Sequence, residues 1–142
     1  MINYLALAAI GAIAAAIALP AHAGSIRVSP TKVEMAGNSA SMLRVRNEEK
    51  TPVTVQVRVF RSIPAGDGFR LEETRDVVAS PPMTTLRPGA ENIVRIVHVG
   101  GAAAEGRRSY RLLVDEVPDR RRMKPGTVAV VVRHSIPVVF SD

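Results

Sequence analysis

The chain contains no cysteine and no tryptophan among its 142 residues. Without cysteine it forms no disulfide, so packing alone must hold its fold together. The same two absences exclude the inter-sheet disulfide and the buried tryptophan that mark antibody-type immunoglobulin domains.

Charged side chains are missing from the first 23 residues, Met1–Ala23. This segment is apolar from Tyr4 to Leu19 and ends in Pro20-Ala21-His22-Ala23. Small residues at Ala21 and Ala23 are typical of the cleavage site of a secretory signal peptide, although the usual basic start is absent. We expect cleavage after Ala23, export to the periplasm, and a mature domain at residues 24–142. The alternative is an uncleaved membrane anchor.

Motifs of catalysis and cofactor binding are also missing. The sequence has no phosphate-binding Gly-Lys-Thr loop, no dinucleotide fingerprint and no nucleophile elbow. His22 leaves with the leader, and His98 and His134 have no carboxylate or cysteine at ligand spacing. We therefore expect no enzyme activity, no cofactor and no metal site, and a protein that acts by binding.

Helical periodicity is absent after residue 23, whereas the alternation typical of strands recurs throughout. Pro52–Phe60 is the clearest case, because valine occupies every second position from Val53 to Val59. An extended run at Ile26–Met35 is interrupted by Pro30, which suits an edge strand that changes partners. The other expected strands are Ser41–Asn47, Leu71–Val78, Ile93–Val99, Tyr110–Val117 and a last strand from Val128. With turn residues between them, these runs predict an all-β, immunoglobulin-like β-sandwich of about seven strands.

The run Val128-Ala129-Val130-Val131-Val132 is apolar at every position. A strand with one face in water alternates apolar and polar residues, and this one does not. Ala129 and Val131 are expected on one face, and Val128, Val130 and Val132 on the other. Something must cover the second apolar row, and that is either more of this protein or a partner chain.

Positive charge exceeds negative charge, giving a net charge of +6. Most of the basic residues alternate with apolar ones along strands, and we interpret them as solvated faces, with no role in nucleic acid binding. The exception is the cluster Arg120-Arg121-Arg122-Met123-Lys124, just before the apolar run. It either contacts an acidic partner or keeps the aggregation-prone apolar strand soluble.

Several motifs in one order resemble the first domain of periplasmic chaperones of the chaperone–usher pilus pathway. They comprise Val28–Val33, Leu43-x-Val45-x-Asn47, Ala79-Ser80-Pro81-Pro82, Leu86-Arg87-Pro88-Gly89-Ala90, Ile93–Ile96, Tyr110–Pro118 and Val128–Phe140. The runs Tyr110–Val114 and Ser135–Val138 are similar to the archaic, spore-coat-like branch.

The resemblance implies a chaperone that caps pilus or coat subunits by lending them its last strand. Val128, Val130 and Val132 are then the side chains that enter the subunit. An outer-membrane usher is a further implied partner. An independent alternative is a self-associating, immunoglobulin-like structural domain that uses the same strand.

Family members carry a basic pair that binds the subunit's C-terminal carboxylate. The first position of this pair matches Lys32, but the second falls on the uncharged Pro137. Arg133, nearby on the same strand, is the candidate replacement.

The family also has a second domain, which we expect to be absent here. That leaves a truncated product, an engineered fragment, a one-domain relative, or a non-functional remnant of a two-domain chaperone.

Overall fold

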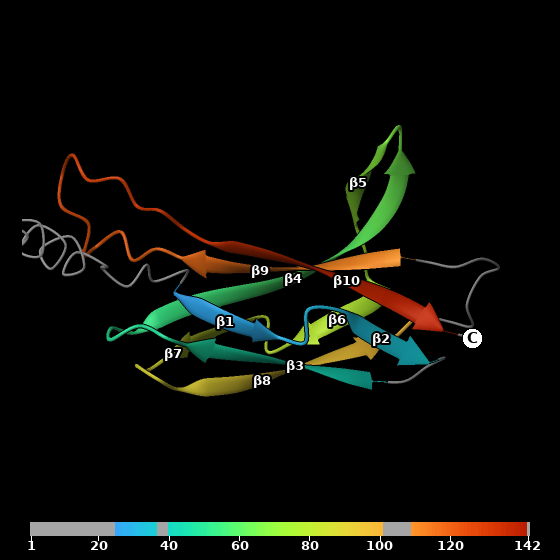
Figure 1. The fold of residues 1–142 in the computed structure, drawn as a ribbon, viewed down its shortest axis with the longest axis horizontal. Helices are drawn as coiled ribbons and strands as arrows, with labels where there is room; N and C mark the ends of the chain where they lie inside the picture. The colour runs from blue at the N-terminus through green and yellow to red at the C-terminus, as the bar shows by residue number, and fades with distance from the viewer. Residues whose placement is uncertain (1–24, 37–39, 101–108, 142) are drawn as a thin grey trace, which may run out of the picture.

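The computed structural model describes residues 25–36, 40–100 and 109–141, and these form two packed sheets (Figure 1). The four-stranded sheet has the order β1-β3-β8-β6. The six-stranded sheet has the order β2-β10-β9-β4-β5, with β7 paired to β4. No helix that could span a membrane occurs in the described part of the chain. The predicted all-β sandwich is confirmed.

Ten strands are present in the described residues, because two of the seven predicted runs divide between the sheets and β7 is an additional strand. The strands are β1 (Ile26–Ser29), β2 (Val33–Ala36), β3 (Ala40–Asn47), β4 (Val53–Ala65), β5 (Gly68–Glu73), β6 (Val77–Ser80), β7 (Met83–Leu86), β8 (Glu91–His98), β9 (Ser109–Val117) and β10 (Arg133–Ser141).

Pro30 divides the first predicted strand as expected. β1 pairs with β3 in one sheet, and β2 pairs in parallel with β10 in the other. Leu71–Val78 divides similarly into β5 and β6, which belong to different sheets. β7 was not predicted, because its four residues, Met83-Thr84-Thr85-Leu86, carry almost no apolar alternation.

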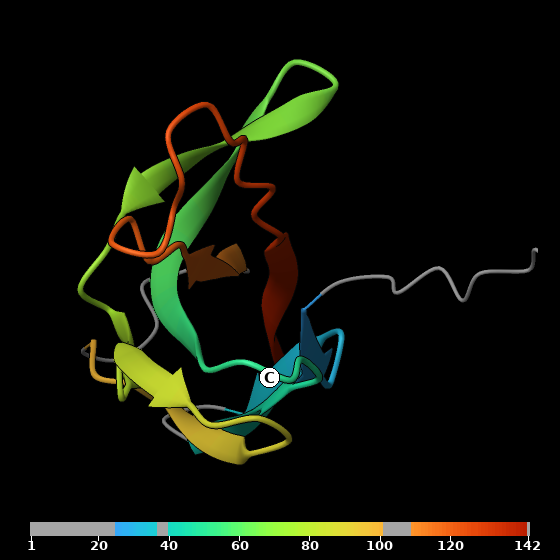
Figure 2. The same ribbon diagram turned by 90° about the vertical axis from the view of Figure 1, so that its left-hand side faces the viewer.

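The core lies between the two sheets and is built from alternate residues of each strand. Leu43, Val45, Val55, Leu112 and Val138 are completely buried, and the intervening residues face outward. Figure 2 looks along the sandwich and shows the two layers enclosing this interior. Packing of aliphatic side chains holds the fold together, as the lack of cysteine requires.

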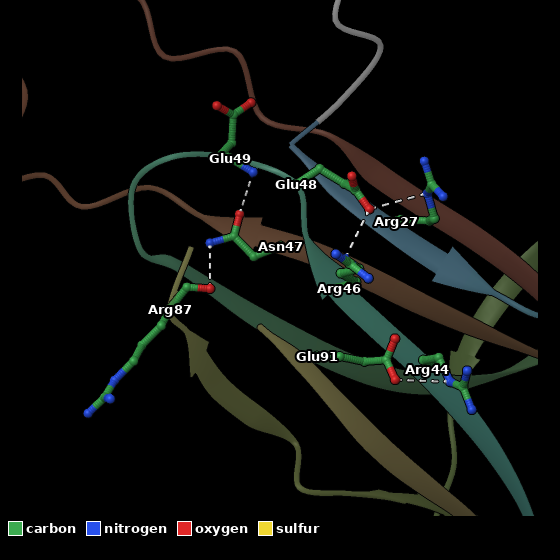
Figure 3. Close-up of polar contacts among 8 residues, drawn as sticks. All are labelled: Arg27, Arg44, Arg46, Asn47, Glu48, Glu49, Arg87 and Glu91. Carbon is green, nitrogen blue, oxygen red and sulfur yellow. Dashed lines mark hydrogen bonds and ion pairs between the residues drawn. The ribbon is translucent and has the colours of Figure 1, made fainter. Parts of the chain in front are cut away.

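One polar side chain, Asn47, is buried at the end of β3, where it organises two loops. Its Nδ2 donates to the carbonyl oxygens of Thr51 (2.8 Å), Leu86 (3.1 Å) and Arg87 (3.2 Å). Its Oδ1 accepts a hydrogen bond from the backbone N of Glu49 (2.8 Å). Figure 3 shows Asn47 between Glu49 and Arg87. Every hydrogen-bonding group of this amide is therefore satisfied, as burial demands.

Candidate functional site

The apolar run before β10 is exposed to solvent. Val128 is 90% exposed and Val130 is 85% exposed, although both are aliphatic. The opposite row is open too, because Ala129 is exposed and Val131 is 49% exposed. Val132 is half-buried. Within the structure, neither row is covered in the way that a β-sandwich normally covers apolar side chains.

The strand predicted from Val128 begins later than expected, at Arg133. A strand needs a neighbour for its hydrogen bonds, and β9 ends at Val117, just before Pro118. The last contact is the backbone N of Glu116, which donates to the carbonyl oxygen of Val132 (3.3 Å). Residues 127–132 therefore lie outside any assigned strand. Figure 1 shows this part of the chain standing away from the two sheets before it enters β10.

A tight turn fixes where the exposed run begins. Thr127 N donates to the carbonyl oxygen of Lys124 (3.2 Å), and Gly126 has a φ of +80°. Proline followed by a glycine of positive φ is typical of a type II turn. This turn at Lys124-Pro125-Gly126 separates the basic cluster from the valines.

One edge of β10 is open over half its length. On one side, β9 pairs with residues Arg133–Val139. On the other side, β2 pairs only with Val138–Ser141. No described strand covers the β2 side of Arg133–Pro137 or of the valine run. This side therefore presents backbone N–H and C=O groups to a further strand.

The valine row continues the alternation of the core. Ile136 and Val138 face inward on β10. Val132, Val130 and Val128 lie at every second position before them in the sequence. Val130 and Val132 line an open cavity of about 380 Å³, together with Pro52 and Val53 of the neighbouring loop and strand. The alternation of inward-facing residues on β10 thus continues past His134 into the exposed valine run.

The start of β10 is anchored by Asp115 of β9. Arg133 donates to it twice, with Nε–Oδ1 at 2.5 Å and Nη2–Oδ2 at 3.3 Å. Arg58 of β4 donates from the other side, with Nη2–Oδ2 at 2.5 Å. Burial raises the pKa of Asp115, but the hydrogen bonds and charges of Arg133 and Arg58 outweigh burial and hold this pKa below its ordinary value. Arg133 is therefore already bound to a carboxylate of its own chain.

Lys32 and Arg133, the two predicted anchor residues, are not brought together by the fold. Lys32 precedes Val33, the partner of Val138, so it lies beside Pro137, four residues along β10 from Arg133. Lys32 Nζ lies 2.7 Å from Glu34 Oε1. That hydrogen bond, followed by the charge of Lys32, lowers the pKa of Glu34.

A different cation lies opposite Pro137. Arg111 of β9 is its direct cross-strand partner, so Lys32 and Arg111 flank Pro137 on its two sides. Two strand spacings separate them, roughly 10 Å. Arg111 is held by Ser135, to whose Oγ it donates (Nη1–Oγ 3.1 Å), and its Cζ lies 4.1 Å from the ring centroid of Phe69. The sequence argument missed Arg111, because only the cross-strand register places it beside Pro137.

Metal ligands do not converge among the described residues, where no group of three or more histidine, aspartate or glutamate side chains is suited to hold an ion. His134 lies on the inner side of β10 opposite Val114, and His98 packs edge-on against Phe140 with 5.0 Å between ring centroids. His22 lies outside the described residues. The features available for function are thus an exposed apolar strand segment, an open strand edge and basic side chains.

Comparison with known proteins gives a consistent result. The sequence profile of the family described as "Pili and flagellar-assembly chaperone, PapD N-terminal domain" matches residues 25–141. No curated protein matches the chain.

Solved structures share the fold. The chaperone–tip adhesion subunit complex CsuC–CsuE, from the archaic Csu pili of Acinetobacter baumannii, matches with a TM-score of 0.69 and 26% identity over 82% of this chain. The Salmonella enterica SafA pilin–SafB chaperone complex matches with a TM-score of 0.65 and 20% identity over 84% of this chain. The Pseudomonas aeruginosa CupB2 chaperone matches with a TM-score of 0.57 and 20% identity over 80% of this chain.

The chain spans about half the length of these proteins, namely 51%, 55% and 54%. The family profile, however, covers nearly all the residues that the structure describes. The chain belongs to the family of pili and flagellar-assembly chaperones, within the region defined by the PapD N-terminal domain.

Proposed function

We propose that this chain binds and caps a pilus or coat subunit by donating residues 128–132 as a β-strand. The observation that carries the proposal is the exposure of Val128 and Val130 beside an open edge of β10. A fully apolar run of this kind is an aggregation hazard unless a partner covers it. The matching complexes CsuC–CsuE and SafB–SafA, each a chaperone with a subunit or pilin, support this assignment.

The mechanism is binding, not catalysis. The main chain of residues 128–132 pairs with a strand edge of the subunit, and alternate valines enter its apolar groove. Val128, Val130 and Val132 each contribute roughly 1.5–3 kcal/mol on full burial, before the cost of ordering the segment. A subunit held in this way has its own edge covered and does not polymerise prematurely.

The subunit's terminal carboxylate is proposed to bind at Lys32. Arg133, the second cation expected from the sequence, is engaged by Asp115 and lies further along β10. Arg111 is the better-placed second cation, because it flanks Pro137 opposite Lys32. Its guanidinium is fixed by Ser135 and Phe69, which lowers the ordering cost on binding.

Export fits this role. We propose that residues 1–23 are a leader removed after Ala23 and that the protein acts in the periplasm. One matching structure, the chaperone SfaE at 16% identity, is described as periplasmic. An outer-membrane usher is a further proposed partner. The leader and its cleavage site lie outside the described residues.

A pull-down from periplasmic extract, with captured proteins identified by mass spectrometry, tests the proposal. Val130→Arg removes a side chain of the donated row, whereas Val131→Arg places the same charge on the opposite row. Wild type and Val131→Arg are expected to capture a small β-rich subunit that Val130→Arg does not capture. Capture by all three proteins would remove the donor-strand mechanism.

Self-association is the second candidate function, because the same exposed edge would pair with a second copy of the chain. Sedimentation of the purified protein without any partner separates the two. A monomer that captures a subunit supports the chaperone, whereas a dimer that Val130→Arg dissociates supports the structural domain. A protein that captures nothing and stays monomeric fits the non-functional remnant.

A further inference from the structure

The outer face of the four-stranded sheet carries a regular array of arginines. They are Arg27 on β1, Arg44 and Arg46 on β3, and Arg95 on β8. This face is on the other sheet from the donor segment, so it plays no part in the function proposed above. We name these four residues the arginine face.

Strand register places like charges next to each other on this face. Arg27 is the direct cross-strand partner of Arg46. Such a pairing is destabilising on its own, and the sandwich fold does not require arginine at exposed positions. Glu48 lies against both guanidiniums, at 3.3 Å from Arg27 Nε and 3.5 Å from Arg46 Nε. Figure 3 shows Glu48 between these two side chains.

The glutamates on this face lie against the Nε side of the arginines. Glu91 contacts Arg44 through Nε at 3.2 Å, just as Glu48 contacts Arg27 and Arg46 through Nε. No hydrogen bond or ion pair of the Arg95 side chain is found among the described residues. Two glutamates thus serve three of the four guanidiniums, which leaves positive charge on this face for further carboxylates.

Apolar side chains are interleaved with the charges. Met42 is 66% exposed and pairs with Arg95, and Ile93 is exposed and pairs with Arg44. Val78 of β6 is exposed beside them. The face therefore offers cationic and apolar positions in alternation, spaced by roughly 5 Å between strands and 7 Å along them.

We infer that the arginine face is a second docking surface, and that its occupant is an acidic, extended protein segment with alternating carboxylate and apolar side chains. Charge complementarity carries this choice, since four arginines face only two glutamates. The interleaved Met42 and Ile93 favour a polypeptide over a lipid headgroup layer, and the two glutamates oppose a continuous polyanion such as nucleic acid.

The test uses the full chain and a fluorescent peptide of about twelve residues that alternates glutamate and valine, with binding measured by anisotropy. The double variant Arg44→Glu, Arg95→Glu is expected to bind it about tenfold more weakly or worse. Arg120→Glu with Arg121→Glu makes the same charge change in the exposed loop and is the matched control. It is expected to change affinity by less than about threefold.

A reciprocal probe keeps the test decisive. A peptide alternating lysine and valine should bind the Arg44→Glu, Arg95→Glu variant and not the wild type, and thermal melting verifies that the variant is folded. If that variant does not fold, the double variant Arg44→Gln, Arg95→Gln takes its place, and a smaller loss of affinity for the glutamate–valine peptide is expected.

Three outcomes would overturn the inference. In the first, the variants of the arginine face and of the loop lose the same affinity for the peptide. In the second, Val130→Asn no longer binds the peptide. In the third, the arginine face binds phosphatidylglycerol vesicles and not the peptide. The first means non-specific attraction, the second pairing with the β10 edge, and the third a membrane surface.

Discussion

Arg133, the first residue of β10, is bound by Asp115 of β9 through two hydrogen bonds (Nε–Oδ1 2.5 Å, Nη2–Oδ2 3.3 Å). Arg58 of β4 shares the same carboxylate. Three neighbouring strands are thus tied together at the point where the exposed valine run joins the sheet. The residue expected from sequence to be a ligand-binding cation is instead a structural anchor for the segment that we propose is donated.

Replacing Asp115 should weaken the fold. Its side chain is only 13% exposed, and Asp115→Asn removes the charge that holds both arginines. We expect a loss of roughly 1–2 kcal/mol in the free energy of unfolding, measured by urea denaturation at neutral pH. Asp119→Asn, which breaks only the exposed pair with Arg122, is the control and should cost less than about 0.5 kcal/mol.

The same carboxylate should make stability depend on pH. Because the pKa of Asp115 is lower in the folded state, its contribution is present above the unfolded pKa of about 4 and is lost as pH falls through the folded value. We expect the urea midpoint of the wild type to fall more steeply below pH 4 than that of Asp115→Asn. Parallel pH profiles for the two proteins would contradict this assignment.

Most of the fold could be predicted from the sequence, because strand alternation is strong wherever one face meets the core. The expected strand Tyr110–Val117 is β9, and the expected strand Pro52–Phe60 lies in β4, which continues to Ala65. The predicted ends of strands were wrong where the neighbouring strand, and not the sequence, determines where pairing begins. The valine run is strand-like by composition but has no neighbour to pair with, so β10 begins at Arg133.

Part of the candidate site could likewise be predicted from the sequence, and part depends on how the strands pair. The valine row was visible in sequence, because its apolar residues are consecutive. The position of Arg111 beside Pro137 was not, because it arises from cross-strand register between residues 26 positions apart. Likewise, the arginine face is assembled from three strands, and no stretch of sequence displays it.

Two valines of equal chemistry on one strand path should differ sharply in their effect on stability. Val138 is completely buried, so Val138→Ala should cost about 2 kcal/mol of unfolding free energy. Val130→Ala removes exposed methyl groups and should change it by less than about 0.5 kcal/mol. Urea denaturation of both variants makes the comparison. A large loss in Val130→Ala would mean that the run is covered within its own chain.

Asn47 should be among the most sensitive polar positions. Asn47→Ala removes the hydrogen bonds that this buried amide makes with the carbonyl oxygens of Leu86 and Thr51 and with the N–H of Glu49. We expect a loss of roughly 2–4 kcal/mol, read as a large fall in the thermal midpoint. Asn92→Ala is the control, since Asn92 Oδ1 accepts a local hydrogen bond from Ile93 N and the Asn92 side chain makes no other among the described residues. Equal effects at the two positions would contradict the role of Asn47 in joining the loops.

Substitutions of Arg111 and Arg133 should have different effects on the affinity for the subunit identified by pull-down. Arg111→Gln is expected to weaken binding about tenfold, because it removes a cation beside Lys32 at the proposed carboxylate anchor. Arg133→Gln should leave the affinity nearly unchanged, since Arg133 is bound to Asp115. A subunit with an amidated C-terminus should bind wild type and Arg111→Gln equally. If only Arg133→Gln weakens binding and amidation abolishes that difference, the anchor is Lys32 with Arg133, as the sequence alone suggested.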